Sequence, residues 1–194
     1  MMVTETVPES AVPNAIHTQR LILQSWQPTD ADELLPVLEA NRNHLSPWIP
    51  AHVATPVPVP LLAKRLAGFA SNFSSNKEWR YAIRRAVNRE LLGEVALFPR
   101  SADGRVPLLA ADRAEIGYWL RSDANGQGFA TEAAAALLGA AAQLERFAHV
   151  EIRCDPRNVL SAAVPKRMGF ALMTTTSDGT DVFFLGRDGF PGAG

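Results

Sequence analysis

The spacing of apolar residues changes several times along the chain, and each spacing predicts an element. Apolar positions three or four residues apart predict helices, over 29–45 and 61–73. Alternating or short apolar runs predict six strands, over 18–27, 79–86, 91–98, 114–123, 149–156 and 181–188. Helices and strands therefore follow one another along the chain, which is typical of a mixed α/β protein.

Capping and breaking residues refine the first half of this pattern. Thr29 is a candidate N-cap for the first helix, and Pro36 predicts a kink in it or a late start. The prolines between 46 and 60 predict a loop, and Asn88 is expected to hold a turn between two strands.

The second half contains a longer helix, expected from Gly128 to about residue 146. It lies between the strands 114–123 and 149–156, so it is expected to be a crossover between neighbouring parallel strands. A short helix over 158–168 should end at Gly169.

Composition limits the class of protein. The 194 residues carry a net charge of -1, which disfavours non-specific binding of nucleic acid. No run of about 20 apolar residues indicates a membrane span, and no secretory signal is seen. A single cysteine, Cys154, cannot form an internal disulfide and fits a reducing cytoplasm. We expect one domain over 17–188, a flexible tail over 1–16 and a loose C-terminal tail over 189–194.

The segment NGQGFATEAAAALL, residues 125–138, places two glycines before a strong helix. The first turn of a helix has unpaired N–H groups and a partial positive charge, so it can hold an anion that glycine lets approach. A simple turn and cap is the alternative. A dinucleotide-binding motif is disfavoured, because Thr131 occupies the position of its third glycine.

With its neighbours, this segment resembles the coenzyme-binding half of the GNAT superfamily of N-acetyltransferases. The strand EIGYWL, the loop GQGFATEA and the later N-x-x-S and KRMGF occur in register over residues 114–170. The similarity is greatest to the branch of the ribosomal-protein alanine acetyltransferases, RimJ and RimL. The resemblance implies a mostly antiparallel α/β sheet, splayed between two central parallel strands and covered by helices on both faces.

The resemblance also implies acetyl-CoA as cosubstrate and assigns residues to it. The backbone of the 125–131 loop would bind the pyrophosphate, although Asn125 stands where the family has Arg or Gln. The strand 118–120, Asn158 and Ser161 would contact the pantetheine arm, and nearby basic residues the adenosine phosphates. The implied coenzyme residues are Tyr118, Trp119, Leu120, Arg121, Asn125, Gly126, Gln127, Gly128, Phe129, Ala130, Thr131, Asn158, Ser161 and Lys166, with Arg157 and Arg167 as further phosphate candidates.

Acetyl transfer to an amine needs a base and a proton donor for the thiolate. Glu115 is the first candidate base, acting through water, and Glu94 the second; both could instead be solvent-facing strand residues. Ser161 is the candidate proton donor, as the resemblance implies, or it caps its helix. Cys154 is expected in the core.

The acceptor site is less well defined by the sequence. Trp48 and His52 are candidate substrate-binding residues in the proline-rich loop, because SPWIP resembles a family feature. His44 and His52 flank Trp48, and either could act as a catalytic base; an exposed histidine without a role is the alternative for each. The four histidines are scattered, so no metal site is expected.

The chemistry of the amine suggests the acceptor class. Reaching the neutral amine at pH 7 costs about 1 kcal/mol for an α-amine and about 4.6 kcal/mol for lysine. With one modest base, an α-amine is favoured, and the expected acceptor is a peptide or protein N-terminus. A polyamine or amino sugar, or a silent CoA-binding sensor, is the alternative. A homodimer through the second helix and the last strand is also possible by analogy.

Overall fold

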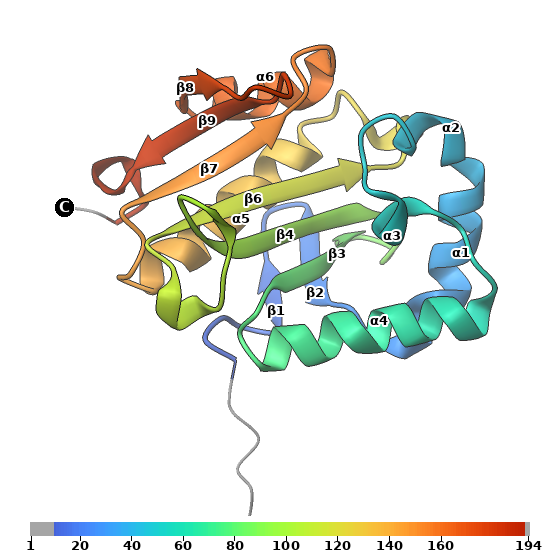
Figure 1. Cartoon of the computed structure of the whole chain (residues 1–194). Coiled ribbons are helices and arrows are strands. Elements are labelled where there is room, and N and C mark those ends of the chain that lie inside the picture. Colours follow the sequence, from blue (N-terminus) through green and yellow to red (C-terminus); the bar gives the residue numbers. More distant parts are fainter. Residues whose placement is uncertain (1–9, 193–194) are drawn as a thin grey trace, which may run out of the picture.

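A nine-stranded sheet forms the centre of the computed structural model, which describes residues 10–192 (Figure 1). The strands are β1 (Ala15–His17), β2 (Leu21–Ser25), β3 (Trp79–Arg85), β4 (Leu91–Ser101), β5 (Gly104–Arg105), β6 (Arg113–Leu120), β7 (His149–Cys154), β8 (Ala171–Thr175) and β9 (Asp181–Gly186). Their spatial order is β1-β2-β3-β4-β6-β7-β9-β8, and β5 pairs with β4.

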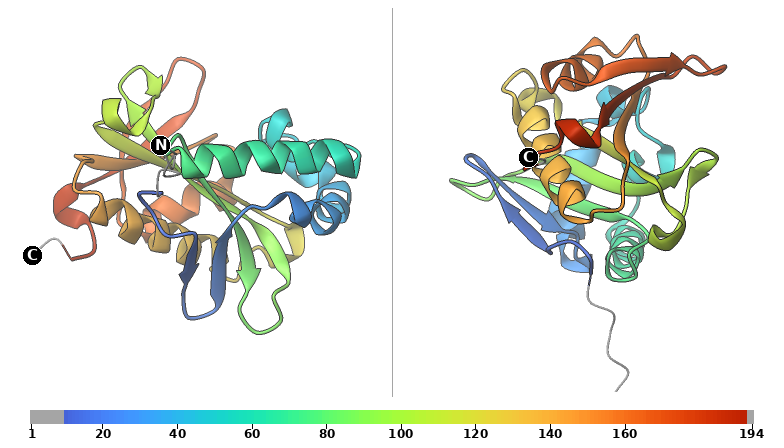
Figure 2. Two further views of the ribbon diagram at one scale, coloured as in Figure 1. Left: turned by 90° about the horizontal axis from the view of Figure 1, so that it is seen from below. Right: turned by 90° about the vertical axis from the view of Figure 1, so that its left-hand side faces the viewer.

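Six α-helices surround this sheet. They are α1 (Ala31–Ala40), α2 (Arg42–Leu45), α3 (Ala51–Ala54), α4 (Val59–Ser74), α5 (Phe129–Gln143) and α6 (Val159–Arg167). Apolar residues of α5 and α6 pack on one face of the sheet, while those of α1 to α4 pack on the other. Figure 2 shows α4 and α5 on opposite sides of the strands. Helices on both faces are as the sequence predicted.

Among the described strands, only one neighbouring pair is parallel, β6 with β7, and α5 is the crossover between them. The other pairs are antiparallel. The predicted mixed α/β sheet with two central parallel strands is therefore confirmed. The pairing of β6 with β7 covers three residue pairs only, ending at Ile116 and Ile152, so the two strands separate as the resemblance implied.

The structure differs from the predicted elements mainly where strands are short or exposed. The strand β1 and the buried Val12 lie in the segment that the sequence assigned to a tail, and buried Phe190 lies in the C-terminal one. The strand β8 was not predicted because all five of its residues are exposed and no alternation marks it. A short helix, α3, interrupts the proline-rich loop. Residues 1–9 and 193–194 lie outside the described chain.

Three local predictions are also corrected. A 3₁₀ turn over Pro28–Asp30 precedes α1, so Thr29 is not the cap, and a capping box joins Gln27 to Asp30. The helix α1 starts early and continues through Pro36. In the turn after β3, Arg89 rather than Asn88 has the positive φ, 65°, while Asn88 accepts a hydrogen bond from the Glu90 amide.

Strands β4 and β6 approach very closely at Gly93. A Cβ built there would lie 2.0 Å from the carbonyl oxygen of Trp119 and 2.9 Å from the Cα of Leu120. The pairing of β3 with β4 shifts register beside this point, between Ile83 and Arg84. Only glycine fits, so Gly93 fixes the position of the last residues of β6.

Candidate active site

The candidate site is a cleft of about 420 Å³ that opens where β6 and β7 separate. Beyond Ile116, β6 continues to Leu120 without a strand neighbour on the β7 side, which leaves an open strand edge. Successive side chains of a strand point to opposite faces. Glu115 and Trp119 therefore lie on the α1–α4 side of the sheet, and Tyr118 lies on the α5 side. Because residues of both sets line it, the cleft connects the two faces.

Many of the predicted site residues meet in this cleft, although they come from distant parts of the chain. Those that line it are Trp48, Glu115, Tyr118, Trp119, Leu120, Asn125, Ala130, Asn158 and Ser161. His44, one of the two histidines considered from the sequence, also lines it, as do residues that the sequence did not assign to the site, among them Arg105, Arg153, Asp155 and Thr180.

The first turn of α5 presents unpaired backbone donors beside the cleft. Within residues 10–192, nothing accepts a hydrogen bond from the six consecutive backbone N–H groups of 126–131. Gly126 and Gly128 have φ values of 74° and 81°, which a residue with a side chain adopts only with strain. A Cβ at Gly126 would meet nothing within 4 Å. The segment therefore offers an open row of donors that fits an anionic phosphate group.

An arginine that the sequence analysis did not single out holds this turn in place. Arg20 donates to the carbonyl oxygen of Gln127 at 2.8 Å and pairs with Glu132 of α5 at 2.7 Å. Although burial alone opposes ionisation of Glu132, hydrogen bonds from Thr18 and Arg20 hold its pKa below the ordinary value. Glu132 is the only acidic residue in the first turn of α5, and the positive charge of Arg20 balances its negative charge. The row of N–H groups therefore keeps its attraction for anions.

Two hydroxyl groups meet on the α5 side of the cleft. The Tyr118 hydroxyl donates to the carbonyl oxygen of Ser161 at 2.8 Å, and the Ser161 hydroxyl lies 3.4 Å from that of Tyr118. Burial raises the pKa of Tyr118, so the phenol stays protonated at neutral pH. Asn158 caps α6 by accepting from the Ser161 amide at 3.1 Å, so the capping role considered for Ser161 belongs to Asn158.

The remaining side chains in this part of the cleft are His44, Asn125 and Cys154. His44 Nε2 lies 3.3 Å from Asn125 Nδ2 and 3.2 Å from the carbonyl oxygen of Leu120. Asn125 is thereby held against α2 at the end of β6. Cys154 is buried in the core, as expected, and also lines the cleft; burial raises the pKa of its thiol.

Several predicted coenzyme residues do not line the cleft. The guanidinium of Arg121 is already paired with Asp123 at 2.7 Å and with Glu90 at 3.0 Å. Lys166 is exposed on α6, 6.0 Å from the ring of Phe183. These two cations lie outside the cleft as the structure stands.

Three further predicted residues occupy other places. The side chain of Phe129 is buried under Arg20, so Phe129 contributes only its backbone N–H to the row of donors. The hydroxyl of Thr131 is buried and finds no partner among the described residues. His52 is exposed on α3 and does not line the cleft, unlike the neighbouring Trp48.

The two candidate bases are both paired with arginine. Glu115 accepts from Arg100 at 2.5 Å and from Arg105 at 2.7 Å. Glu94 is buried away from the cleft, where it accepts from Trp26 at 2.8 Å and from Arg80 at 2.9 Å. The structure thus places Glu115 at the cleft and gives Glu94 a packing role. Neither is a solvent-facing strand residue, since their exposed fractions are 7% and 4%.

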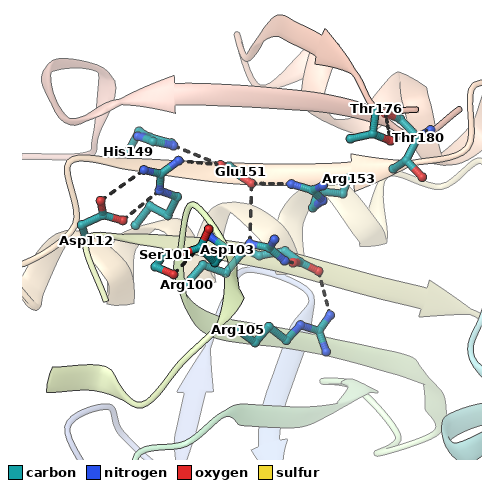
Figure 3. A network of polar contacts seen from close by, with 12 residues as sticks. Arg100, Ser101, Asp103, Arg105, Asp112, His149, Glu151, Arg153, Thr176 and Thr180 are labelled. Atoms are coloured by element: carbon teal, nitrogen blue, oxygen red, sulfur yellow. Dashed lines mark hydrogen bonds and ion pairs between the residues drawn. The ribbon is translucent and has the colours of Figure 1, made fainter. Parts of the chain in front are cut away.

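Next to Glu115, the neighbouring strand carries Glu151, whose exposed fraction is 2%. Its carboxylate lies 3.0 Å from Arg153, 3.2 Å from His149 and 3.6 Å from Arg113. Figure 3 shows Arg153 and His149 on either side of Glu151. Burial opposes ionisation, but the hydrogen bonds and nearby cations hold the pKa of Glu151 below its ordinary value. We call the connected set of ion pairs the β6–β7 arginine network; its members are Arg100, Arg105, Asp112, Arg113, Glu115, His149, Glu151 and Arg153.

Neither a metal site nor a membrane span is found in the described chain. Within residues 10–192, no three side chains of His, Cys, Asp or Glu gather in a group that could hold a metal ion. In the same range, no helix combines the length and the apolar character needed to cross a membrane.

A sheet that splits around a cleft, with a row of free backbone N–H groups at a helix start beside it, has the features of a protein that binds a phosphate-bearing ligand. Comparison with known proteins identifies the class. A family model described as the acetyltransferase (GNAT) domain matches residues 20–171. The probable N-acetyltransferase YjcK of Bacillus subtilis (strain 168) is 28% identical over 142 residues, covering 73% of this chain and 75% of that protein.

Solved structures show the same fold. RimJ of Mycobacterium smegmatis, in complex with CoA-disulfide, matches with a TM-score of 0.76 at 21% identity, covering 92% of this chain and 90% of that one. RimL, a ribosomal L7/L12 alpha-N-protein acetyltransferase in complex with coenzyme A, matches with a TM-score of 0.73 at 19% identity, covering 92% and 98%. The chain belongs to the GNAT acetyltransferase family, and its activity is that of an acetyl-CoA-dependent N-acetyltransferase.

Proposed function

We propose that this enzyme acetylates the α-amino group of a peptide or protein N-terminus, by direct transfer while both substrates are bound. The observation that carries the proposal is the cleft that connects the two faces of the sheet. It lets the coenzyme lie on the α5 side and the acceptor reach the same point from the α1–α4 side. That RimL is named as an α-N-protein acetyltransferase supports this acceptor class.

The coenzyme is proposed to lie along the edge of β6. The six free N–H groups of 126–131 would hold the pyrophosphate, since backbone donors at a helix start bind phosphate without help from a side chain. The open edge of Tyr118–Leu120 would pair with the pantetheine amides. Bound acetyl-CoA supplies the thioester whose acetyl carbon the amine attacks.

The hydroxyl groups of Tyr118 and Ser161 are proposed to protonate the leaving thiolate. As the new C–N bond forms and the C–S bond breaks, the sulfur gains an electron pair and needs one proton. Tyr118 is protonated at neutral pH because burial raises its pKa, and Ser161 lies 3.4 Å away to share the proton. The sequence pattern pointed only to Ser161 for this step.

Glu115 is proposed to take the proton that the amine loses, through a water molecule. Each carboxylate oxygen has two lone pairs, so accepting one hydrogen bond from an arginine leaves room for a water. The demand on this base is small, since about half of an α-amine is already neutral near pH 8. Trp48, with an exposed fraction of 37%, would form one wall of the acceptor site.

The test is thiol release from acetyl-CoA with three sets of acceptors: peptides with free N-termini, the same peptides with blocked N-termini but a free lysine, and a panel of polyamines and amino sugars. The proposal expects turnover with the first set only. Turnover with the third set alone would overturn the peptide assignment. CoA binding without turnover in any set would identify a catalytically silent sensor. The proposed homodimer is tested separately, by the mass of the protein in solution.

A further inference from the structure

Two arginines line the cleft on the α1–α4 side, where we have placed the acceptor. Arg105 lies in β5 and Arg153 in β7, on the same face as Glu115 and Trp119. Their side chains remain partly open to solvent, at 46% for Arg105 and 26% for Arg153. Neither residue has a part in acetyl transfer as described so far.

Each guanidinium is fixed in position by buried groups. Arg105 donates through Nη2 to Glu115 at 2.7 Å, and its Cζ lies 3.4 Å from the centroid of the Phe98 ring. Arg153 donates through Nη1 to Glu151 at 3.0 Å. Figure 3 shows both arginines reaching toward the buried carboxylates from different strands. Cations held in this way lose little side-chain entropy when a ligand binds.

Each guanidinium also keeps donors that no described residue uses. Nε and Nη1 of Arg105, and Nε and Nη2 of Arg153, make no hydrogen bond with residues 10–192. The indole N–H of Trp119, a residue 6% exposed that lines the same cleft, is buried without an acceptor in the described chain. Several unused donors of the described residues are therefore gathered at this end of the cleft.

The net charge of the β6–β7 arginine network also favours an anionic group at this end of the cleft. Its four arginines share three carboxylates, those of Asp112, Glu115 and Glu151. The network therefore carries an excess of positive charge, even with His149 neutral. A polycationic acceptor would be repelled here, whereas an acceptor with an anionic group would complete the pairing.

We infer that Arg105 and Arg153 bind a carboxylate of the acceptor that lies a few atoms from its amine. This rests on the proposed function, and on a peptide the carboxylate belongs to an acidic side chain at the second or third residue. Arginine suits this task because its planar fork matches the two oxygens of a carboxylate. The two residues would thus select among N-termini rather than take part in the chemistry.

The experiment compares two amidated peptides, Ser-Glu-Ala-Ala-Ala and Ser-Gln-Ala-Ala-Ala, in initial-rate assays at saturating acetyl-CoA. We expect kcat/KM to be about tenfold higher for the acidic peptide, mainly through KM. Equal values for the two peptides would overturn the inference and leave the proposed function intact. Turnover of neither peptide, with turnover of polyamines, would overturn the proposed function itself.

Variants assign the preference to the two residues. Arg105→Gln leaves Glu115 with Arg100, and Arg153→Gln leaves Glu151 with Arg113 and His149, so neither variant strands a buried carboxylate. In both, the ratio of kcat/KM between the two peptides should fall toward one. The matched control is Arg89→Gln, an exposed arginine in the turn after β3, which should keep the ratio of the wild type. An unchanged ratio in both cleft variants would contradict the inference.

A charge-reversal variant shows whether Arg105 binds the carboxylate of the acceptor or only supports the fold. Arg105→Glu should lose the preference for Ser-Glu and gain one for Ser-Lys, which damage to the fold would not produce. Free serine against serine amide tests the other source of a carboxylate. If serine alone is acetylated and is preferred over its amide, the carboxylate site stands and the peptide acceptor is wrong.

Discussion

Tyr118 is the residue whose removal should affect chemistry most selectively. Tyr118→Phe deletes the hydroxyl that donates to Ser161 but leaves the ring and the β6 edge in place. We expect kcat to fall about 100-fold, a common cost of losing a general acid, with the KM for acetyl-CoA nearly unchanged. The lost hydrogen bond should lower the free energy of unfolding by about 1 kcal/mol.

The measurement is steady-state thiol release at several acetyl-CoA concentrations. Ser161→Ala is the companion variant and should cost less, because Tyr118 keeps its proton at neutral pH without it. A Tyr118→Phe enzyme with the wild-type kcat would show that the thiolate takes its proton from another source.

Glu151 should make the stability of the protein depend on pH in the acid range. Its pKa in the folded protein lies below that of the unfolded chain, about 4.3, because of its cationic neighbours. Its contribution to stability is therefore complete above that unfolded value and is lost as the pH falls toward the folded pKa. Replacing it by glutamine leaves Arg153 without its carboxylate partner, while Arg100 and Arg113 keep Glu115 and Asp112, and should cost about 2 kcal/mol at pH 7.

Thermal unfolding of wild type and Glu151→Gln between pH 3 and pH 7 tests this. The difference in Tm between the two proteins should shrink as the pH falls below about 4. A difference that stays constant over this range would mean that the carboxylate contributes by packing and not by charge.

The partners of these residues show where residue-level prediction from sequence ends. Tyr118, Asn158 and Ser161 were found because they lie in short motifs that resemble a known family. Arg20 was not, since it pairs with a glutamate 112 positions away and no local pattern marks it. Likewise, no local pattern indicates that Arg100 and Arg105 hold Glu115, because these pairings form only when neighbouring strands come together.

At the scale of elements, Gly93 should be intolerant of any side chain. The methyl group of Gly93→Ala would lie 2.0 Å from the backbone oxygen of Trp119, so β4 or β6 must shift. We expect the free energy of unfolding to fall by about 3 kcal/mol. Because β6 forms the edge that is proposed to hold the pantetheine arm, affinity for coenzyme A should fall as well.

The matched control is Gly139→Ala, a glycine within α5 whose added methyl meets nothing within 4 Å. It should raise the free energy of unfolding by about 0.5–1 kcal/mol, as expected for alanine in a helix. Chemical denaturation of both variants gives the comparison. Similar stabilities for the two would contradict the close approach of β4 and β6.

Whole elements were predicted correctly where the apolar pattern is long. They were missed where a segment becomes a strand only by pairing with a neighbouring strand. The alanine-rich run of α5 predicts a helix, and the apolar residues of β7 predict a strand. The three residues of β1 form a strand only because β2 supplies hydrogen bonds, and β8 only because β9 does. Such edge strands have too little buried area to leave a pattern in the sequence.

At the scale of the molecule, one topological feature joins the sites proposed for the coenzyme and the acceptor. A sheet with antiparallel pairs throughout would have no gap, but the crossover through α5 brings β6 and β7 together in parallel for three residue pairs only. The split leaves a passage between the helix-covered faces, with the free N–H groups of α5 on one side and the arginines on the other. Neither face alone could bring a thioester and an amine together.

Coenzyme A should therefore stabilise the whole molecule, because it would contact elements on both sides of the gap between β6 and β7. At a concentration 100 times its Kd, a ligand adds about 2.7 kcal/mol, which for a chain of this size raises Tm by roughly 5–10 °C. Pantetheine, which lacks the diphosphate, should produce little of this shift, because the N–H groups of 126–131 would stay unpaired.

The variant that tests this linkage is Gly126→Ala, which puts a side chain on a residue of positive φ, 74°, within the row of donors and so strains the backbone that carries them. Gly169→Ala is its matched control, since Gly169 also has a positive φ, 80°, and open space around it, but lies at the end of α6. Both should lose about 1 kcal/mol from backbone strain. Only Gly126→Ala should also lose most of the shift with coenzyme A. A full shift in Gly126→Ala, or an equal shift with pantetheine, would show that the phosphates are held elsewhere.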